Sequence, residues 1–148
     1  MPELTIRKGM KNDIDGIALL ENSCFGSPLS ADMILKDMTE NSMANYIVAE
    51  LDGVLAGYIG FWCVIEECQI NSVAVAPSLR KQHIGTMLLN TCIDAARASG
   101  IKRWTIEVRA GNEAAKTLYD RFGFVENGIR KGYYDNPKED AVLMVLGD

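Results

Sequence analysis

Glu107 is the first residue that could do chemistry, because it is a carboxylate near the end of a strand-like segment. Residues 104–109 (WTIEVR) alternate between apolar and polar side chains, which places Glu107 on the face opposite Ile106 and Val108. A carboxylate in such a position can act as a general base, directly or through a water molecule. Taken alone, however, the pattern is more typical of a charge on a solvated strand face.

Tyr119 is the second such residue. It shares a helix face with Leu118 and Phe122, in a segment that Asn112 is expected to cap at its start. A phenol is neutral near pH 7 and can donate a proton to a stronger base, such as a leaving thiolate. By itself the position favours an amphipathic tyrosine that packs in the core.

The third candidate is the segment RKQHIG, residues 80–85, which lies where a strand-like run ends and a helix-like run begins. Helix N-termini expose unpaired N–H groups and carry partial positive charge, and Arg80 and Lys81 add full charges beside them. Such a junction can hold a diphosphate. It is neither a P-loop nor a dinucleotide fingerprint, and local physics alone favours a helix start with solvated basic side chains.

The composition is that of one ordinary globular domain, spanning residues 1–148. Hydrophobic residues make up 48% of the chain and charged residues 24%, enough for a sizeable core. The net charge of −5 argues against general binding to nucleic acid. No apolar run approaches the length of a membrane span, and the start lacks the apolar core of a signal peptide. We therefore expect a cytoplasmic protein with no direct nucleic-acid binding and no membrane association.

The cysteine pattern does not predict a metal site. The four cysteines form no C-x-x-C pair, and the chain has a single histidine. Reduced thiols in partly buried positions are the favoured interpretation, and no metal is expected. The four residues are Cys24, Cys63, Cys68 and Cys92.

Hydrophobic periodicity predicts strands and helices in the order βααβββαβαββ. Strands are expected over residues 4–7, 46–50, 54–64, 68–75, 104–109, 126–131 and 141–146. Helices are expected from an N-cap at Asn12, after an N-cap at Ser30, from His83 to Gly100 and from Asn112 to Phe122, with residues 23–30 as a loop. This order is typical of the α/β (α+β) class, in which helices cover a mixed central sheet.

Together, the three candidates resemble the GNAT acetyltransferase superfamily over nearly the whole chain. SVAVAPSLRKQHIGTMLL resembles the family's acetyl-CoA motif, V-A-V-x-P followed by an R-x-x-G-x-G loop. NEAAKTLYDRFGF, residues 112–124, resembles N-x-x-A-x-x-L-Y-x-x-x-G-F. A finer resemblance is to the RimI-type enzymes, which acetylate the N-terminal alanine of a small-subunit ribosomal protein. It rests on IEVRAGNEAAKTLYDRFGF, on the tail IRKGYYDNPKEDAVLM, and on CFGSPLS, where Leu29 replaces the subfamily's tryptophan.

The resemblance implies a GNAT-like fold and direct transfer of acetyl from acetyl-CoA, without a metal, to the N-terminus of a ribosomal protein. Glu107 would take a proton from the acceptor ammonium, and Tyr119 would protonate the CoA thiolate. Tyr133 and Tyr134 would bind the acceptor peptide. The implied cofactor-binding residues are Val73, Ala74, Val75, Arg80, Lys81, Gln82, His83, Ile84, Gly85, Thr86 and Asn112.

Within this set, Val73 and Val75 would lend backbone groups to the pantetheine arm, as a sheet edge accepts an added strand. The N–H of Val75 would face the thioester oxygen as charge develops there. The amides of residues 81–86 would hold the diphosphate, with Arg80 nearby.

His83 departs from the motif, because it stands where the family pattern has its first glycine. If the position is helical, histidine costs little and its side chain can turn to solvent. Alternatively, a protonated imidazole would add charge beside the phosphates and make acetyl-CoA affinity fall as the pH rises.

Other acceptors and another class of function remain open. A GNAT enzyme can act on a lysine side chain, a polyamine or another small amine. The pair Tyr133 and Tyr134 favours a peptide, although aromatic residues at a strand edge also simply pack. A non-catalytic acyl-CoA-binding module is disfavoured, because both Glu107 and Tyr119 are present.

Overall fold

The computed structural model describes residues 3–25, 29–135 and 137–147, and its elements follow the predicted order. The strands are β1 (Leu4–Lys8), β2 (Ala44–Leu51), β3 (Val54–Val64), β4 (Glu67–Val75), β5 (Arg103–Arg109), β6 (Val125–Tyr134) and β7 (Glu139–Gly147). The helices are α1 (Ile14–Cys24), α2 (Ala31–Glu40), α3 (Ile84–Ala98) and α4 (Glu113–Arg121). Two 3-10 turns, η1 (Lys11–Asp13) and η2 (Pro77–Leu79), precede α1 and α3.

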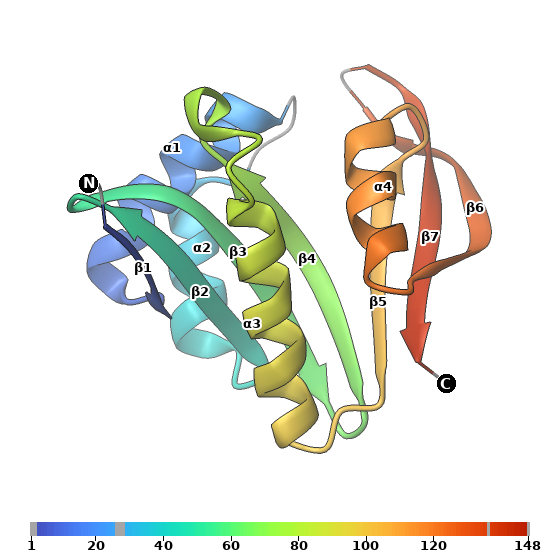
Figure 1. The fold of residues 1–148 in the computed structure, drawn as a ribbon, viewed down its shortest axis with the longest axis horizontal. Helices are drawn as coiled ribbons and strands as arrows, with labels where there is room; N and C mark the ends of the chain where they lie inside the picture. Colours follow the sequence, from blue (N-terminus) through green and yellow to red (C-terminus); the bar gives the residue numbers. More distant parts are fainter. Residues whose placement is uncertain (1–2, 26–28, 136, 148) are drawn as a thin grey trace.

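The strands form one mixed sheet in the order β1-β2-β3-β4-β5-β7-β6, with helices on both faces (Figure 1). Neighbouring strands are antiparallel except for β4 and β5. Helices α1 and α2 cover one face, and α3 and α4 cover the other. This arrangement confirms the predicted fold class.

Each face of the sheet has its own core. On one face α3 and α4 pack against the larger cluster, which includes Leu88, Cys92 and Trp104. On the other face α1 and α2 contribute Ile17 and Ile34 to a smaller cluster. Because side chains alternate along each strand, the sheet serves both cores at once.

The parallel pairing between β4 and β5 is short, so the two strands leave space between them. The two strands are paired over only four positions, from Glu67 opposite Arg103 to Ile70 opposite Ile106. Beyond this point they separate, as Figure 1 shows. A bulge at Asn71 in β4 accompanies the separation, because the β3–β4 register shifts there. The second half of β4 is therefore free of a neighbour on the side that faces β5.

The predicted start of the first helix is wrong in detail. Asn12 lies inside η1, and Asp13 is the residue that precedes α1. The predicted loop is also too long, because α1 continues through Ser23 and Cys24; residues 26–28 lie outside the described residues. The Ser30 cap is confirmed, since its hydroxyl accepts a hydrogen bond from the N–H of Met33 at 3.2 Å.

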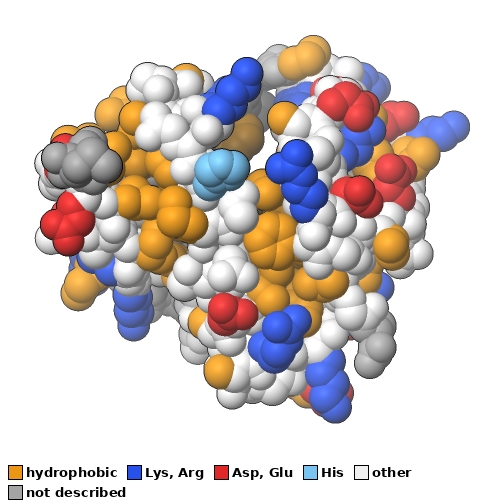
Figure 2. Space-filling view, in the orientation of Figure 1, with side chains coloured by type: hydrophobic (Ala, Val, Ile, Leu, Met, Phe, Trp, Pro, Cys, Tyr) orange, Lys and Arg blue, Asp and Glu red, His pale blue; other side chains and the backbone are white. Residues whose placement is uncertain are grey.

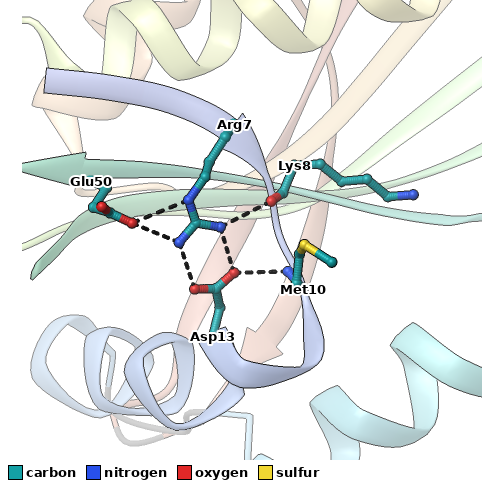
Figure 3. A network of polar contacts seen from close by, with 5 residues as sticks. All are labelled: Arg7, Lys8, Met10, Asp13 and Glu50. Carbon is teal, nitrogen blue, oxygen red and sulfur yellow. Dashed lines mark hydrogen bonds and ion pairs between the residues drawn. The ribbon is translucent and has the colours of Figure 1, made fainter. Parts of the chain in front are cut away.

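Asp13 does not cap α1 because a long-range network holds its carboxylate (Figure 3). Arg7 donates two hydrogen bonds to it, at 2.8 and 2.9 Å, and the N–H of Met10 donates a third at 2.8 Å. Arg7 also bonds Glu50 on β2 at 2.7 Å. The hydrogen bonds with Arg7 hold the pKa of Asp13 below its ordinary value. The network thus joins β1, β2 and the start of α1.

Asp13→Asn is expected to lower the free energy of unfolding by about 1–3 kcal/mol at pH 7, because a nearly buried charged hydrogen-bond pair is broken. The depressed pKa means that this stabilisation is present above the unfolded value of about 3.9 and is lost as the pH falls below it. Urea unfolding of both proteins at pH 7 and pH 3 measures the effect. An equal difference at both pH values would contradict the assignment.

All four cysteines are free thiols; Cys24 and Cys63 are partly buried, as predicted, whereas Cys68 and Cys92 are fully buried. Burial raises the pKa of Cys63 to about 12, which keeps this thiol protonated and poorly nucleophilic. Among the helices that the structure describes, none combines the length and apolar character that a membrane span requires.

Candidate active site

A cavity of about 880 Å³ opens between β4 and β5, where the two strands separate. It brings together six of the residues singled out in the sequence: Val73, Glu107, Asn112, Tyr119, Tyr133 and Tyr134. Residues 80–86 are not among the described residues that line it. The two catalytic candidates therefore share one hollow, and the candidate diphosphate loop lies outside it.

The β4 wall of the cavity presents backbone groups. The N–H of Ala76 donates to the carbonyl of Ala56 on β3 at 2.8 Å. Hydrogen bonding alternates along an antiparallel pair, so Ala74 also turns its polar backbone groups toward β3. Val73 and Val75 consequently turn theirs toward the side of β5. This is the orientation that pairing with an extended ligand requires.

Ala74 itself is not in this position. The residue is 2% exposed, and its side chain belongs to the core under α1 and α2. The backbone contact with a cofactor stays a prediction for Val73 and Val75, whose polar groups have the orientation that it needs. The thiol of Cys24 lies 3.4 Å from the carbonyl oxygen of Val75, which agrees with that orientation.

Glu107 projects from β5 with its side chain 17% exposed. One carboxylate oxygen forms an ion pair with Nε of Arg130 at 3.3 Å, and the other accepts a hydrogen bond from the hydroxyl of Tyr133 at 3.2 Å. Both partners come from β6. These contacts hold the carboxylate at the cavity wall, where it can accept a proton from a bound amine.

Tyr119 reaches the cavity from α4, with only 4% of the residue exposed. Its ring meets Phe124 edge-on, with ring centroids 5.5 Å apart. Burial raises the pKa of Tyr119, so the phenol stays protonated throughout the physiological range. A protonated hydroxyl in a cavity can act as a proton donor.

Tyr133 and Tyr134 form one wall of the cavity, with their rings edge-to-face at 5.0 Å. The hydroxyl of Tyr134 donates to the carbonyl of Glu107 at 3.0 Å, and the guanidinium of Arg109 lies 4.4 Å from its ring centroid. Burial raises the pKa of Tyr134 to about 12. Arg109 in turn forms an ion pair with Glu139 at 3.2 Å, so the aromatic wall is fixed to β5 and β7.

Asn112 is confirmed as the cap of α4, because its side-chain oxygen accepts a hydrogen bond from the N–H of Ala115 at 3.1 Å. The same residue lines the cavity. One side chain therefore both starts the helix that carries Tyr119 and faces the space between the strands.

The loop before α3 is more strained than the motif predicts. His83, the residue before α3, has φ 64° and ψ 18°, and Lys81 has φ 67°. The idea that His83 is already helical is therefore wrong, because the residue adopts the left-handed conformation that glycine tolerates best. Its side chain is exposed, and Figure 2 shows the imidazole at the surface with basic side chains nearby. The glycine that stands here in the motif the sequence resembles would adopt this conformation without that strain.

His83→Gly is expected to raise the free energy of unfolding by about 0.5–1 kcal/mol. The substitution removes the cost of a left-handed non-glycine residue, and the larger entropy that glycine loses on folding offsets part of the gain. Thermal unfolding of the two proteins measures it. Lys81→Gly, at the other left-handed position, is a matched comparison and should change stability in the same direction; a less stable His83→Gly would contradict the strain.

Glu21 and Asp37 also line the cavity and were not singled out in the sequence. Asp37 on α2 accepts hydrogen bonds from the hydroxyl of Tyr46 at 2.7 Å and from the indole N–H of Trp62 at 3.0 Å. Glu21 had a sequence signal, because it continues the apolar stripe of Ile14 and Ile17 along α1. A carboxylate on the buried face of a helix is unusual, and this position could have identified Glu21 as a candidate functional residue.

Comparison with known proteins agrees with this geometry. Residues 14–124 match the model of the acetyltransferase (GNAT) family. A Bacillus subtilis (strain 168) protein, named provisionally as a ribosomal protein bS18-alanine N-acetyltransferase, is 38% identical over 94% of this chain and 92% of its own. The Escherichia coli (strain K12) ribosomal protein bS18-alanine N-acetyltransferase is 34% identical over 75% of this chain and 78% of its own.

The fold gives the same result. The crystal structure of the ribosomal-protein-S18-alanine N-acetyltransferase from Escherichia coli superposes with a TM-score of 0.90 and 28% sequence identity. The match covers 98% of this chain and 94% of that one. Acetyl-CoA is the acetyl donor of the family. On these grounds the chain is an N-acetyltransferase and belongs to the acetyltransferase (GNAT) family.

Proposed function

We propose that residues 1–148 form one acetyltransferase domain that acetylates the N-terminal alanine of ribosomal protein bS18. The observation that carries the proposal is the cavity between β4 and β5, which holds a carboxylate, a protonated phenol and an aromatic wall. The names of the relatives supply the acceptor. The reaction would then take place in the cytoplasm, where ribosomal proteins are made.

Acetyl-CoA would enter with its pantetheine arm along the free edge of β4. The backbone groups of Val73 and Val75 face that side and can pair with the amides of the arm, as a sheet edge pairs with an added strand. Arg80 and the amides of residues 81–86 at the start of α3 would hold the diphosphate. Asn112 would contact the arm from the other wall of the cavity.

The chemistry needs no covalent enzyme intermediate. The acceptor arrives as an ammonium ion, and Glu107 accepts one of its protons, directly or through water. The amine nitrogen attacks the thioester carbon, and the N–H of Val75 would stabilise the charge that develops on the carbonyl oxygen. The carbon–sulfur bond then breaks and Tyr119 gives its proton to the CoA thiolate. The second proton of the nitrogen restores the Tyr119 phenol, and Glu107 releases the first proton to solvent. The products are an amide, CoA thiol and one released proton.

The deciding experiment is an acceptor panel. The protein is incubated with acetyl-CoA and peptides that begin with alanine, the same peptides with a blocked N-terminus, lysine-containing peptides and polyamines. Thiol release gives the rate, and mass spectrometry locates the acetyl group. We expect acetylation of the free alanine N-terminus and none of its blocked partner; exclusive acetylation of lysine side chains or polyamines would refute the acceptor.

A further inference from the structure

Glu21 differs from the other buried carboxylate of the protein. Among the charged side chains that the structure describes, Asp13 and Glu21 are the buried ones, with 6% and 3% of the residue exposed. Asp13 has the bidentate hydrogen bonds of Arg7. Glu21 has neutral donors, the hydroxyl of Ser72 at 2.8 Å and the N–H of Leu29 at 3.5 Å.

No cation offsets the charge of Glu21 within the described part of the chain, because none of the ion pairs found there includes it. A buried carboxylate without a cation is costly, and burial accordingly raises the pKa of Glu21. Packing alone does not explain a glutamate at position 21. An apolar residue there would continue the apolar stripe of α1 without the cost of a buried charge. A residue kept at such a cost usually has a function.

The position of Glu21 identifies the missing cation. Its side chain lines the same cavity as Glu107, but it comes from α1 on the β4 side, whereas Glu107 comes from β5. Ser72, which donates to it, is the neighbour of Val73 on the free part of β4. The carboxylate is thus fixed next to the strand edge along which the acetyl donor is proposed to lie. The reaction itself brings a cation to this place, the ammonium group of the acceptor.

We propose that Glu21 binds the α-ammonium group of the acceptor and, together with Glu107 across the cavity, holds it for transfer. This inference rests on the proposed function, since it names the residue that receives the acceptor in that same site. An ammonium group has three N–H donors, so it can serve two carboxylates at once. Glu21 keeps its hydrogen bond while Glu107 takes the proton that must leave.

The arrangement also accounts for release of the product. Acetylation turns the ammonium into a neutral amide, which cannot compensate a buried negative charge. The favourable interaction with Glu21 is therefore lost as the reaction is completed. The same logic selects cationic amines over uncharged groups of the same shape, because only the cation offsets the buried carboxylate.

Glu21→Gln tests the role by kinetics. The variant keeps the volume and one acceptor oxygen but removes the charge. We expect KM for an alanine-starting peptide to rise about tenfold or more, since a charge-assisted hydrogen bond is lost. The acetyl-CoA dissociation constant should stay within about twofold of the parent value, because the donor carries no ammonium group at that point. An unchanged KM for the peptide would overturn the proposal.

The direction of the stability change separates binding from a structural role. Removing an uncompensated buried carboxylate should leave Glu21→Gln at least as stable as the parent in urea unfolding, whereas Asp13→Asn, the matched control, should be less stable with its KM unchanged. A Glu21→Gln protein that is less stable than the parent would show that the carboxylate supports the fold instead.

A second measurement tests the contact itself without turnover. Calorimetry in the presence of CoA compares an alanine peptide with its desamino analogue, in which hydrogen replaces the amino group. The parent should bind the ammonium form more tightly, and Glu21→Gln should lose about tenfold of that preference. Equal preference in both proteins would refute the contact. If the parent acetylates no alanine peptide at all, it is the proposed acceptor that fails, which the panel above shows separately.

Discussion

Glu107→Gln should lower kcat for acetyl transfer by about 10²–10⁴-fold, the usual contribution of a positioned general base. Glutamine keeps the shape and one of the two oxygens that Arg130 and Tyr133 contact separately, but it cannot accept the proton that the ammonium must lose. Acetyl-CoA affinity should be nearly unchanged, because the cofactor is proposed to bind along β4 and at the start of α3. Thiol release measures the first quantity, and calorimetry the second.

Glu126→Gln is the matched control for this substitution. Glu126 is an exposed glutamate on β6, so the change removes the same charge from the same half of the sheet. We expect parent rates for it. A Glu107→Gln protein that transfers acetyl at the parent rate to a peptide with a free N-terminus would show that another group is the base.

Tyr119→Phe should lower kcat by about 10–10²-fold, less than the loss of the base. The reason is that a thiolate already leaves well without a proton, so its protonation assists the step without being indispensable. The ring and its contact with Phe124 remain, so the melting temperature should stay within about 2 °C of the parent.

The pH dependence of the parent checks the same assignment. Because burial raises the pKa of Tyr119, the phenol remains protonated as the pH rises through 9. The ratio of the parent rate to the Tyr119→Phe rate should therefore be constant from pH 7 to pH 9. A ratio that falls to one within this range would mean that the phenol ionises there and cannot be the proposed acid.

The order of the elements was predictable because the hydrophobic period is local. The alternation of residues 104–109 appears in the sequence without any knowledge of the fold, and the structure has strand β5 at these residues. The start of α1 was not predictable in this way. Asp13 is held by Arg7, which Glu50 also binds, so the residue at which the helix begins depends on a strand far away in the sequence.

Those residues of the site that belong to a sequence motif were predictable. Glu107, Asn112 and Tyr119 lie within one short segment of sequence, and the structure places all three at one cavity. Glu21 is absent from that prediction because its significance depends on what surrounds it. Burial, the missing cation and the neighbouring Ser72 become visible only when α1 packs against β4. The conformation of His83 likewise depends on how the chain turns into α3.

The short β4–β5 pairing gives the middle of the sheet an unusual property. Beyond Ile70, β4 has a neighbour on one side only, so two central residues, Val73 and Val75, have amide hydrogens in the position of an edge strand. In the free protein these two amides should exchange with deuterium much faster than that of Ala74 between them, which faces β3. Occupancy by acetyl-CoA should slow them selectively. The exchange rates of these two amides would then measure the fraction of enzyme that has acetyl-CoA bound, although β4 lies in the middle of the sheet.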